Sequence, residues 1–181
     1  MTKQPQILER KIAAESRIFK IEEIHLRFSN GNERIYERMR SGSRGAIMVV
    51  PMLDDETIIL IREYSVGTER YELGFPKGLI DPGETAEAAA NRELQEEIGY
   101  GSKNIELLSR MTAVPGYWGG RADIFTATDL YESWLEGDEP EPLEIVPWKL
   151  SNYKALLAEE TFSEARSIAA LMLLRDKLNG Y

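Results

Sequence analysis

The sequence contains no cysteine among its 181 residues and has one histidine. Without cysteine, the chain can form neither a disulfide nor a thiolate zinc site. It also lacks an apolar run long enough to span a membrane, and its first residues lack the apolar core of a signal peptide. These absences predict a cytoplasmic protein with no membrane partner.

Positive charge is scarce as well. The chain has 22 Lys and Arg against 31 Asp and Glu, a formal net charge of -9. General nucleic-acid binding needs a basic surface, so we expect no nucleic-acid partner. A small anionic substrate is compatible with this charge, because bound cations reverse the local field.

The remaining composition is that of an ordinary globular protein, with 43% hydrophobic and 29% charged residues. The length suits one domain, or one domain with a small extension.

The most informative stretch runs over residues 78–100, GLIDPGETAEAAANRELQEEIGY. From Thr85 onward its composition is typical of a helix, rich in Ala, Glu, Gln, Leu and Arg. Thr85 is a suitable N-cap, and Gly99 is a residue on which a helix ends. We therefore expect a helix between them.

Three carboxylates share one side of this predicted helix. At about 100° per residue, Glu93, Glu96 and Glu97 fall within an arc of about 100°. Such carboxylates repel one another unless something neutralises them, and Mg²⁺ or Mn²⁺ takes oxygen ligands of this kind. A solvated acidic helix face is the simpler alternative.

The spacing within this stretch resembles the signature of the Nudix hydrolases, G-x5-E-x7-R-E-U-x-E-E-x-G-U, where U is a bulky apolar residue. Every fixed position matches: Gly78, Glu84, Arg92, Glu93, Glu96, Glu97 and Gly99. Tyr100 departs from the usual aliphatic residue at the last position but is still bulky and mostly apolar.

The rest of the chain predicts mixed strands and helices. The first 42 residues resemble an antiparallel β-ribbon, with strands at 17–28 and 33–40 around an Asn-Gly turn. Further predicted strands are 45–53, 57–64, 105–114, 122–128 and 143–148, with helices at 152–159 and 163–178. The predicted loops are 65–77, 115–120 and the acidic segment 130–142.

These elements, together with the resemblance, imply the fold class α/β: a Nudix α/β/α sandwich with a mixed sheet, preceded by the N-terminal antiparallel β-ribbon. We divide the chain into a ribbon, 1–42, and a Nudix hydrolase domain, 43–181. The ribbon presents apolar residues too early in the chain to complete a core alone, which predicts a homodimer.

Residues 18–148 resemble the ADP-ribose pyrophosphatase branch of the family, and the whole chain is similar to its bacterial ADP compounds hydrolases. The branch often has proline sixteen positions beyond the last glycine of the signature, where this chain has Pro115. Ser65 stands where the branch usually has a substrate-binding arginine.

The resemblance assigns the signature residues to metal binding. Glu93 and Glu97 are the main ligands, Glu96 is a further ligand or a catalytic helper, and the backbone carbonyl of Lys77 completes a site. The cofactor is Mg²⁺ or Mn²⁺, with more than one ion per site. Arg92 orients the glutamates.

A general base must take a proton from the attacking water. In this branch the base is often a glutamate on the long loop after the signature. We favour Glu139 and then Glu141. Glu96 or Glu97 is the alternative within the signature, and a merely solvated acidic loop is the simpler interpretation.

Further residues are candidates for substrate binding. Arg38 and Arg62 can pair with phosphates, while aromatic side chains offer faces for adenine or a second ring. The set is Arg38, Arg62, Phe28, Tyr36, Pro115 and Tyr117.

The function implied is Mg²⁺-dependent hydrolysis of the pyrophosphate linkage in ADP-linked nucleotides such as ADP-ribose, NADH and diadenosine polyphosphates. The alternatives are a nucleoside triphosphate pyrophosphohydrolase and a non-catalytic, ligand-sensing Nudix-like module. An isopentenyl diphosphate isomerase is disfavoured, because the usual catalytic thiol is absent.

Overall fold

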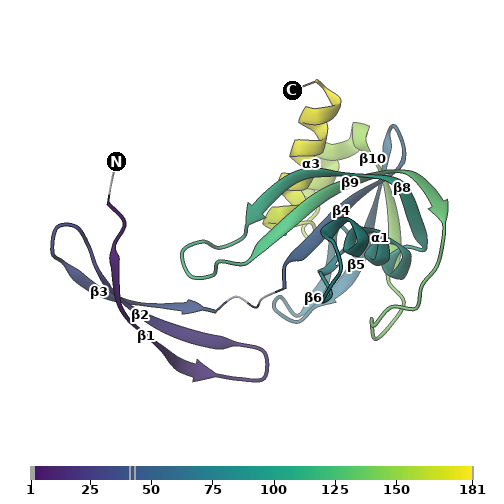
Figure 1. Cartoon of the computed structure of the whole chain (residues 1–181). Helices are drawn as coiled ribbons and strands as arrows, with labels where there is room; N and C mark the ends of the chain where they lie inside the picture. The colour runs from purple at the N-terminus through teal and green to yellow at the C-terminus, as the bar shows by residue number, and fades with distance from the viewer. Residues whose placement is uncertain (1–2, 41, 43, 181) are drawn as a thin grey trace. The chain divides into compact units, whose positions relative to one another are not determined.

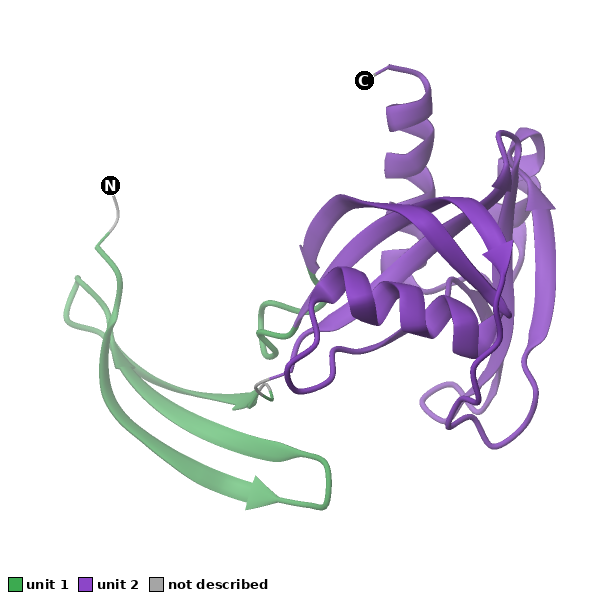
Figure 2. Cartoon of the chain, turned by 45° about the vertical axis from the view of Figure 1, so that its right-hand side comes forward, with its two compact units in different colours: residues 1–43, 112–120 green, residues 44–111, 121–181 purple. Residues whose placement is uncertain are grey.

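The computed structural model describes residues 3–40, 42 and 44–180. The chain divides into two compact units (Figure 2). One comprises residues 1–43 with 112–120, and the other comprises residues 44–111 with 121–181. Each unit is described by itself.

The smaller unit contains a three-stranded antiparallel sheet of β1 (Gln6–Glu15), β2 (Lys20–Arg27) and β3 (Glu33–Met39) (Figure 1). The predicted pair of strands corresponds to β2 and β3. Strand β1 is an addition that the sequence did not predict. Its residues are nearly all exposed, so pairing with β2, rather than burial of an apolar face, gives it strand structure.

Residues 112–120 belong to the same unit as this sheet. The Met39 backbone N–H donates to the Tyr117 carbonyl oxygen at 2.8 Å, and Met39 forms a parallel bridge with Trp118. The end of β3 and the Pro115 loop are therefore joined through the backbone.

The larger unit is built on a mixed sheet with the strand order β10-β5-β4-β9-β8. Its strands are β4 (Ala46–Asp54), β5 (Thr57–Ser65), β8 (Tyr100–Thr112), β9 (Arg121–Glu132) and β10 (Glu144–Lys149). Strands β4 and β9 are parallel, whereas β5 is antiparallel to both β4 and β10.

The prediction of a loop over residues 65–77 was wrong. This segment contains β6 (Arg70–Gly74), which pairs with β5, and it ends where β7 (Lys77–Leu79) begins to pair with β4. Both strands are very short. Their ladder bonds to longer neighbours stabilise them, and five or three residues carry too little periodicity to reveal a strand.

Helices cover both faces of the sheet. Helix α1 (Ala86–Glu97) packs on one face, and α2 (Tyr153–Ala158) and α3 (Ala165–Leu178), which follow the short 3₁₀ helix η1 (Leu150–Asn152), pack on the other.

Strand β4 shows the alternation that this sandwich requires. Ile47 and Val49 pack in the cluster that contains Leu94 of α1, while Met48 packs in the cluster that contains Leu171 of α3. All are fully buried. The prediction of an α/β/α sandwich with a central strand buried on both faces is confirmed.

Candidate active site

A turn between β7 and α1 begins the signature helix. Gly83 has φ +86°, a conformation that favours glycine, and the Glu84 N–H donates to the Asp81 carbonyl oxygen at 3.0 Å. The Thr85 hydroxyl then accepts from the Ala88 N–H at 3.1 Å. Helix α1 therefore begins at the predicted cap, and its first signature glutamate is fixed by this turn.

The helix ends as predicted before Gly99, which has φ +74°. A second constraint acts on the same glycine, because a β-carbon there would lie 2.6 Å from Cε3 of Trp134. Gly99 thus both ends the helix and makes room for the loop that follows β9.

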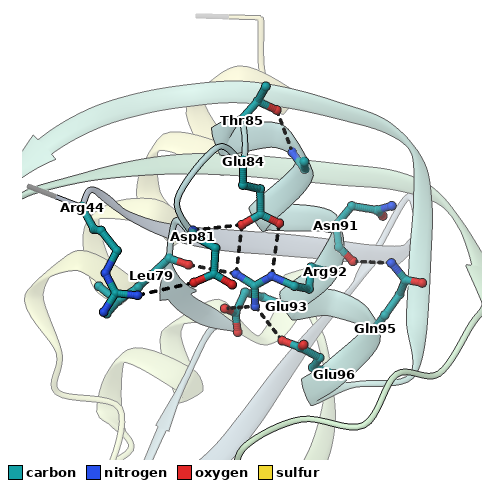
Figure 3. Close-up of polar contacts among 11 residues, drawn as sticks. Arg44, Leu79, Asp81, Glu84, Thr85, Asn91, Arg92, Glu93, Gln95 and Glu96 are labelled. Carbon is teal, nitrogen blue, oxygen red and sulfur yellow. Dashed lines mark hydrogen bonds and ion pairs between the residues drawn. The ribbon is translucent and has the colours of Figure 1, made fainter.

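Arg92 lies among three signature glutamates (Figure 3). Its Nη1 donates to Glu93 Oε1 and to Glu96 Oε2, each at 2.7 Å, and its Nε donates to Glu84 Oε1 at 3.2 Å. Its Nη2 also donates to the Leu79 carbonyl oxygen at 2.9 Å. Burial alone would lower the pKa of Arg92, but its contacts with the three carboxylates raise it. One guanidinium therefore fixes the positions of three carboxylates.

Glu93 lies directly against the backbone of Gly78. A β-carbon at Gly78 would lie 1.9 Å from Glu93 Oε1, so no other residue fits there without displacing the carboxylate. Gly78 is in strand β7, and its backbone is not in the left-handed region. We interpreted this glycine as a loop residue, and that was wrong: it allows α1 to approach β7 closely.

Glu93 and Glu97 are buried, with 8% and 5% of their surface exposed. Burial raises the pKa of Glu97 to about 9, against the opposing charge of Lys77. It also raises the pKa of Glu93 to about 7, although Arg92 opposes the shift. The Lys77 backbone N–H donates to Glu97 Oε2 at 3.2 Å. Both carboxyls therefore lack the positive charge that full ionisation at neutral pH needs.

Glu93 and Glu96 line an open cavity of about 680 Å³. In the part of the chain that the structure describes, no three Asp, Glu or His side chains converge as a ready metal site. The donors nevertheless fit a hard divalent cation: they are carboxylate oxygens, and two of them belong to buried groups whose pKa is raised for want of a counter-charge.

The acidic loop after β9 contributes the opposite wall of this cavity through Glu136, Gly137, Asp138 and Glu139. Partial burial, together with the charges of Glu63 and Asp138, raises the pKa of Glu139. Glu141 lies elsewhere: it is exposed and accepts a hydrogen bond from the Tyr71 hydroxyl at 2.6 Å. Of the two predicted bases, the loop brings only Glu139 to the cavity.

Arg62 does not line the cavity. Its Nε donates to Glu144 Oε2 at 2.9 Å, and its Nη1 donates to Thr161 Oγ1 at 3.3 Å. Strand alternation explains this placement. Ile61 packs on the α1 side of the sheet, and Glu63, two residues on, points the same way, whereas Arg62 points to the other face.

The other predicted substrate-binding residues belong to the smaller unit. Phe28 and Tyr36 make an edge-to-face contact with their ring centroids 6.4 Å apart. Arg38 donates to Glu22 Oε2 from Nε at 2.8 Å and from Nη2 at 2.7 Å. Pro115 and the half-exposed Tyr117 lie in the 112–120 loop.

Sequence reasoning missed three residues of the larger unit. Arg44 lines the cavity and pairs with Asp81 at 3.4 Å. Glu63 forms an ion pair with the Lys77 ammonium, and Tyr71 binds Glu141. The alternation in TIILIREY would have indicated Glu63, but no local pattern indicates the other two.

Comparison with known proteins agrees with this geometry. The NUDIX domain model matches residues 42–172, and the model of the NudE-type Nudix hydrolase N-terminal domain matches residues 5–38. The chain is 51% identical to the ADP compounds hydrolase NudE of Escherichia coli (strain K12), over 98% of this chain and 95% of that protein.

More distant and structural relatives agree. The chain is 28% identical to the ADP-ribose pyrophosphatase of Bacillus subtilis (strain 168), over 94% of this chain and 95% of that protein. A crystal structure of an ADP compounds hydrolase matches with a TM-score of 0.95 and 50% identity, covering 99% of this chain and 97% of that one. The signature residues, the sandwich fold and these similarities together lead to one conclusion: this chain belongs to the Nudix hydrolase family.

Proposed function

We propose that this chain hydrolyses the pyrophosphate linkage of ADP-linked compounds such as ADP-ribose, NADH and diadenosine polyphosphates. The products are AMP and a second phosphate compound. One observation carries the proposal: the complete Nudix signature lines a cavity in a chain that resembles, over nearly its whole length, a protein named for ADP compounds.

The cofactor is Mg²⁺ or Mn²⁺, with more than one ion per site, held by Glu93 and Glu97 with help from Glu96. When bound, such ions neutralise phosphate oxygens and lower the pKa of water. The chain's own residues prepare the donors. Arg92 orients Glu93 and Glu96, and the Lys77 N–H fixes one oxygen of Glu97.

Glu139 acts as the general base that takes a proton from the attacking water. Its place in the wall of the cavity and its raised pKa support this role, since a base works best when its pKa is nearer the working pH. Glu141 positions the loop through Tyr71. The base within the signature, Glu96 or Glu97, is the alternative.

The smaller unit supplies contacts to the nucleotide. Phe28, Tyr36 and Tyr117 offer ring faces to a base, Pro115 shapes their loop, and Arg38 pairs with a phosphate. Arg62 keeps a phosphate-binding role only if its guanidinium leaves Glu144 and Thr161.

The active form is a homodimer in the cytoplasm. Support for the dimer comes from the exposed apolar side chains of the N-terminal sheet and its turns: Ile7, Ile12, Ile18, Phe19, Ile35 and Tyr36. A partner of this size would remove them from water. Among the described residues, no helix is both long and apolar enough to cross a membrane.

The test is a substrate panel. ADP-ribose, NADH, diadenosine polyphosphates and nucleoside triphosphates are incubated with the protein and Mg²⁺ in ¹⁸O-water, and the products are separated by chromatography. We expect label in a product monophosphate, with neither inorganic phosphate nor pyrophosphate released. Faster turnover of plain nucleoside triphosphates than of every conjugate would overturn the proposal.

A further inference from the structure

A second cavity, of about 420 Å³, lies in the larger unit and shares Lys77 with the cavity of the signature glutamates. Strands β5 and β6 and the start of α3 surround it. The polar side chains that define it are Glu63, Ser65, Glu72, Lys77, Glu164 and Arg166. None of these residues except Lys77 belongs to the site described above.

Lys77 connects the two cavities. Its backbone N–H donates to Glu97 Oε2 at 3.2 Å, beside the proposed metal ligands, while its ammonium pairs with Glu63 in the second cavity. A pyrophosphate held by cations at the signature glutamates therefore lies next to the opening of the second cavity. One of the two groups attached to that pyrophosphate has to occupy this direction.

The charges of the second cavity disfavour another phosphate. Both cations in its wall already have a carboxylate partner: Lys77 pairs with Glu63, and Arg166 Nε donates to Glu164 Oε1 at 2.6 Å. The third carboxylate, Glu72, accepts from Arg70 Nε at 2.8 Å. Carboxylates thus outnumber cations in the wall, and an incoming anion would meet repulsion.

The same wall suits a neutral group that carries several hydroxyls. Hydroxyls donate to carboxylate oxygens in strong, charge-assisted bonds, and Ser65 can both donate and accept. Ile61 and Leu73, buried in the wall, give an apolar surface for the carbon face of a ring. The volume is ample for one sugar and lies within the usual range of small-molecule sites.

We propose that this cavity binds the sugar attached to the phosphate on the side away from the adenosine. The assignment rests on the proposed function and adds a specificity pocket to it. A substrate with a ribose in this position gains contacts that a third phosphate cannot make.

Two substrates with the same pyrophosphate separate the pocket from the chemistry: ADP-ribose, and the β-methyl ester of ADP, in which a methyl group replaces the sugar. Ser65→Leu fills the cavity with an apolar side chain. We expect it to lower kcat/KM for ADP-ribose at least tenfold, mainly through KM, and to change the value for the methyl ester less than twofold. Ser151→Leu, at an exposed position of η1, is the matched control.

Product inhibition supplies an independent measurement. In Ser65→Leu the inhibition constant of ribose 5-phosphate should rise at least tenfold, with that of AMP unchanged. Glu164→Gln preserves size and removes a charge, so it should show the same selective loss to a smaller degree. It also tests the pocket if Ser65→Leu fails to fold by thermal melting.

Equal losses for both substrates, or weaker inhibition by AMP, would overturn the pocket and leave the proposed function standing. If the unmodified protein hydrolyses neither compound, the proposed function fails and the pocket assignment fails with it.

Discussion

At the scale of single residues, the three helix glutamates differ in environment although they share one arc. Glu93 and Glu97 are buried, whereas Glu96 is only partly so. Burial raises the pKa of both buried carboxyls above the ordinary value of 4.5. These groups therefore oppose folding of the metal-free protein at neutral pH and favour cation binding there.

The sign of the Glu97 effect on stability follows from its raised pKa. The stabilisation from its neutral form is fully present below about pH 4 and is lost as the pH rises through about 9. In chelator at pH 8, Glu97→Gln should therefore raise the melting temperature, by at least about 2–4 °C if the gain is about 1 kcal/mol. Thermal melting between pH 5 and 9 measures this.

The same variant should lose what metal provides. Added Mg²⁺ should raise the melting temperature of the unmodified protein but not that of Glu97→Gln, and turnover of the variant should fall by orders of magnitude. Glu87→Gln, at an exposed position of the same helix, is the control and should change neither property by much. Near-normal turnover in Glu97→Gln, or full activity in excess chelator, would remove Glu97 from the site.

Gly78→Ala tests the close packing of β7 against α1. The new methyl group would fall 1.9 Å from Glu93 Oε1, so the carboxylate must move. We expect about a 10–100-fold loss of turnover or metal affinity, the usual cost of a misplaced ligand. Circular dichroism should report a folded protein.

Gly42→Ala is the matched control, because a β-carbon there has no neighbour within 4 Å. Its activity should equal that of the unmodified protein. If Gly78→Ala were equally active, Glu93 would not need its observed position.

At the scale of elements, the acidic loop between β9 and β10 is tied down at one side chain and left open at another. The Tyr71 hydroxyl on β6 donates to Glu141, and this contact raises the pKa of Tyr71. Glu139, two residues earlier, lines the cavity instead. The two glutamates should therefore respond differently to substitution.

We expect Glu139→Gln to lower kcat at least about 100-fold with metal binding intact, as removal of a general base does. Glu141→Gln should cost less than about tenfold. Tyr71→Phe should cost a similar amount, and the double variant Tyr71→Phe, Glu141→Gln no more than either alone, because both remove one interaction. Steady-state kinetics of the four variants decide this, and a greater loss in Glu141→Gln than in Glu139→Gln would reverse the assignments.

At the scale of the whole molecule, the N-terminal sheet leaves apolar side chains exposed, among them Phe19 and Ile35. The proposed homodimer covers them. Phe19→Asp and Ile35→Asp should each weaken dimerisation at least about tenfold, because a charge would enter an apolar contact. Sedimentation at micromolar concentration measures the change.

Leu107→Asp provides the comparison, since Leu107 is about as exposed but lies on β8 of the larger unit. It should leave the association state unchanged. A monomeric unmodified protein would refute the dimer.

The sequence by itself determined the family, the sandwich fold and the position of the signature helix. These features depend on local information: a cap at Thr85, a glycine at Gly99, and strands with long apolar runs such as residues 45–53. Fixed spacing along one helix also sufficed to place Arg92 beside its glutamates, because residues one and four positions apart meet on a helix without help from the rest of the chain.

Only the tertiary structure decided which residues reach the cavity from elsewhere. Arg62 and Glu63 are adjacent in sequence, but the pleat of β5 points them to opposite faces of the sheet. Glu139 and Glu141 are equivalent in composition and separate only because Tyr71, 70 positions away, binds one of them. Strands β1, β6 and β7 exist because neighbouring strands supply their hydrogen bonds, and Gly78 is required because a helix formed later in the chain packs against it.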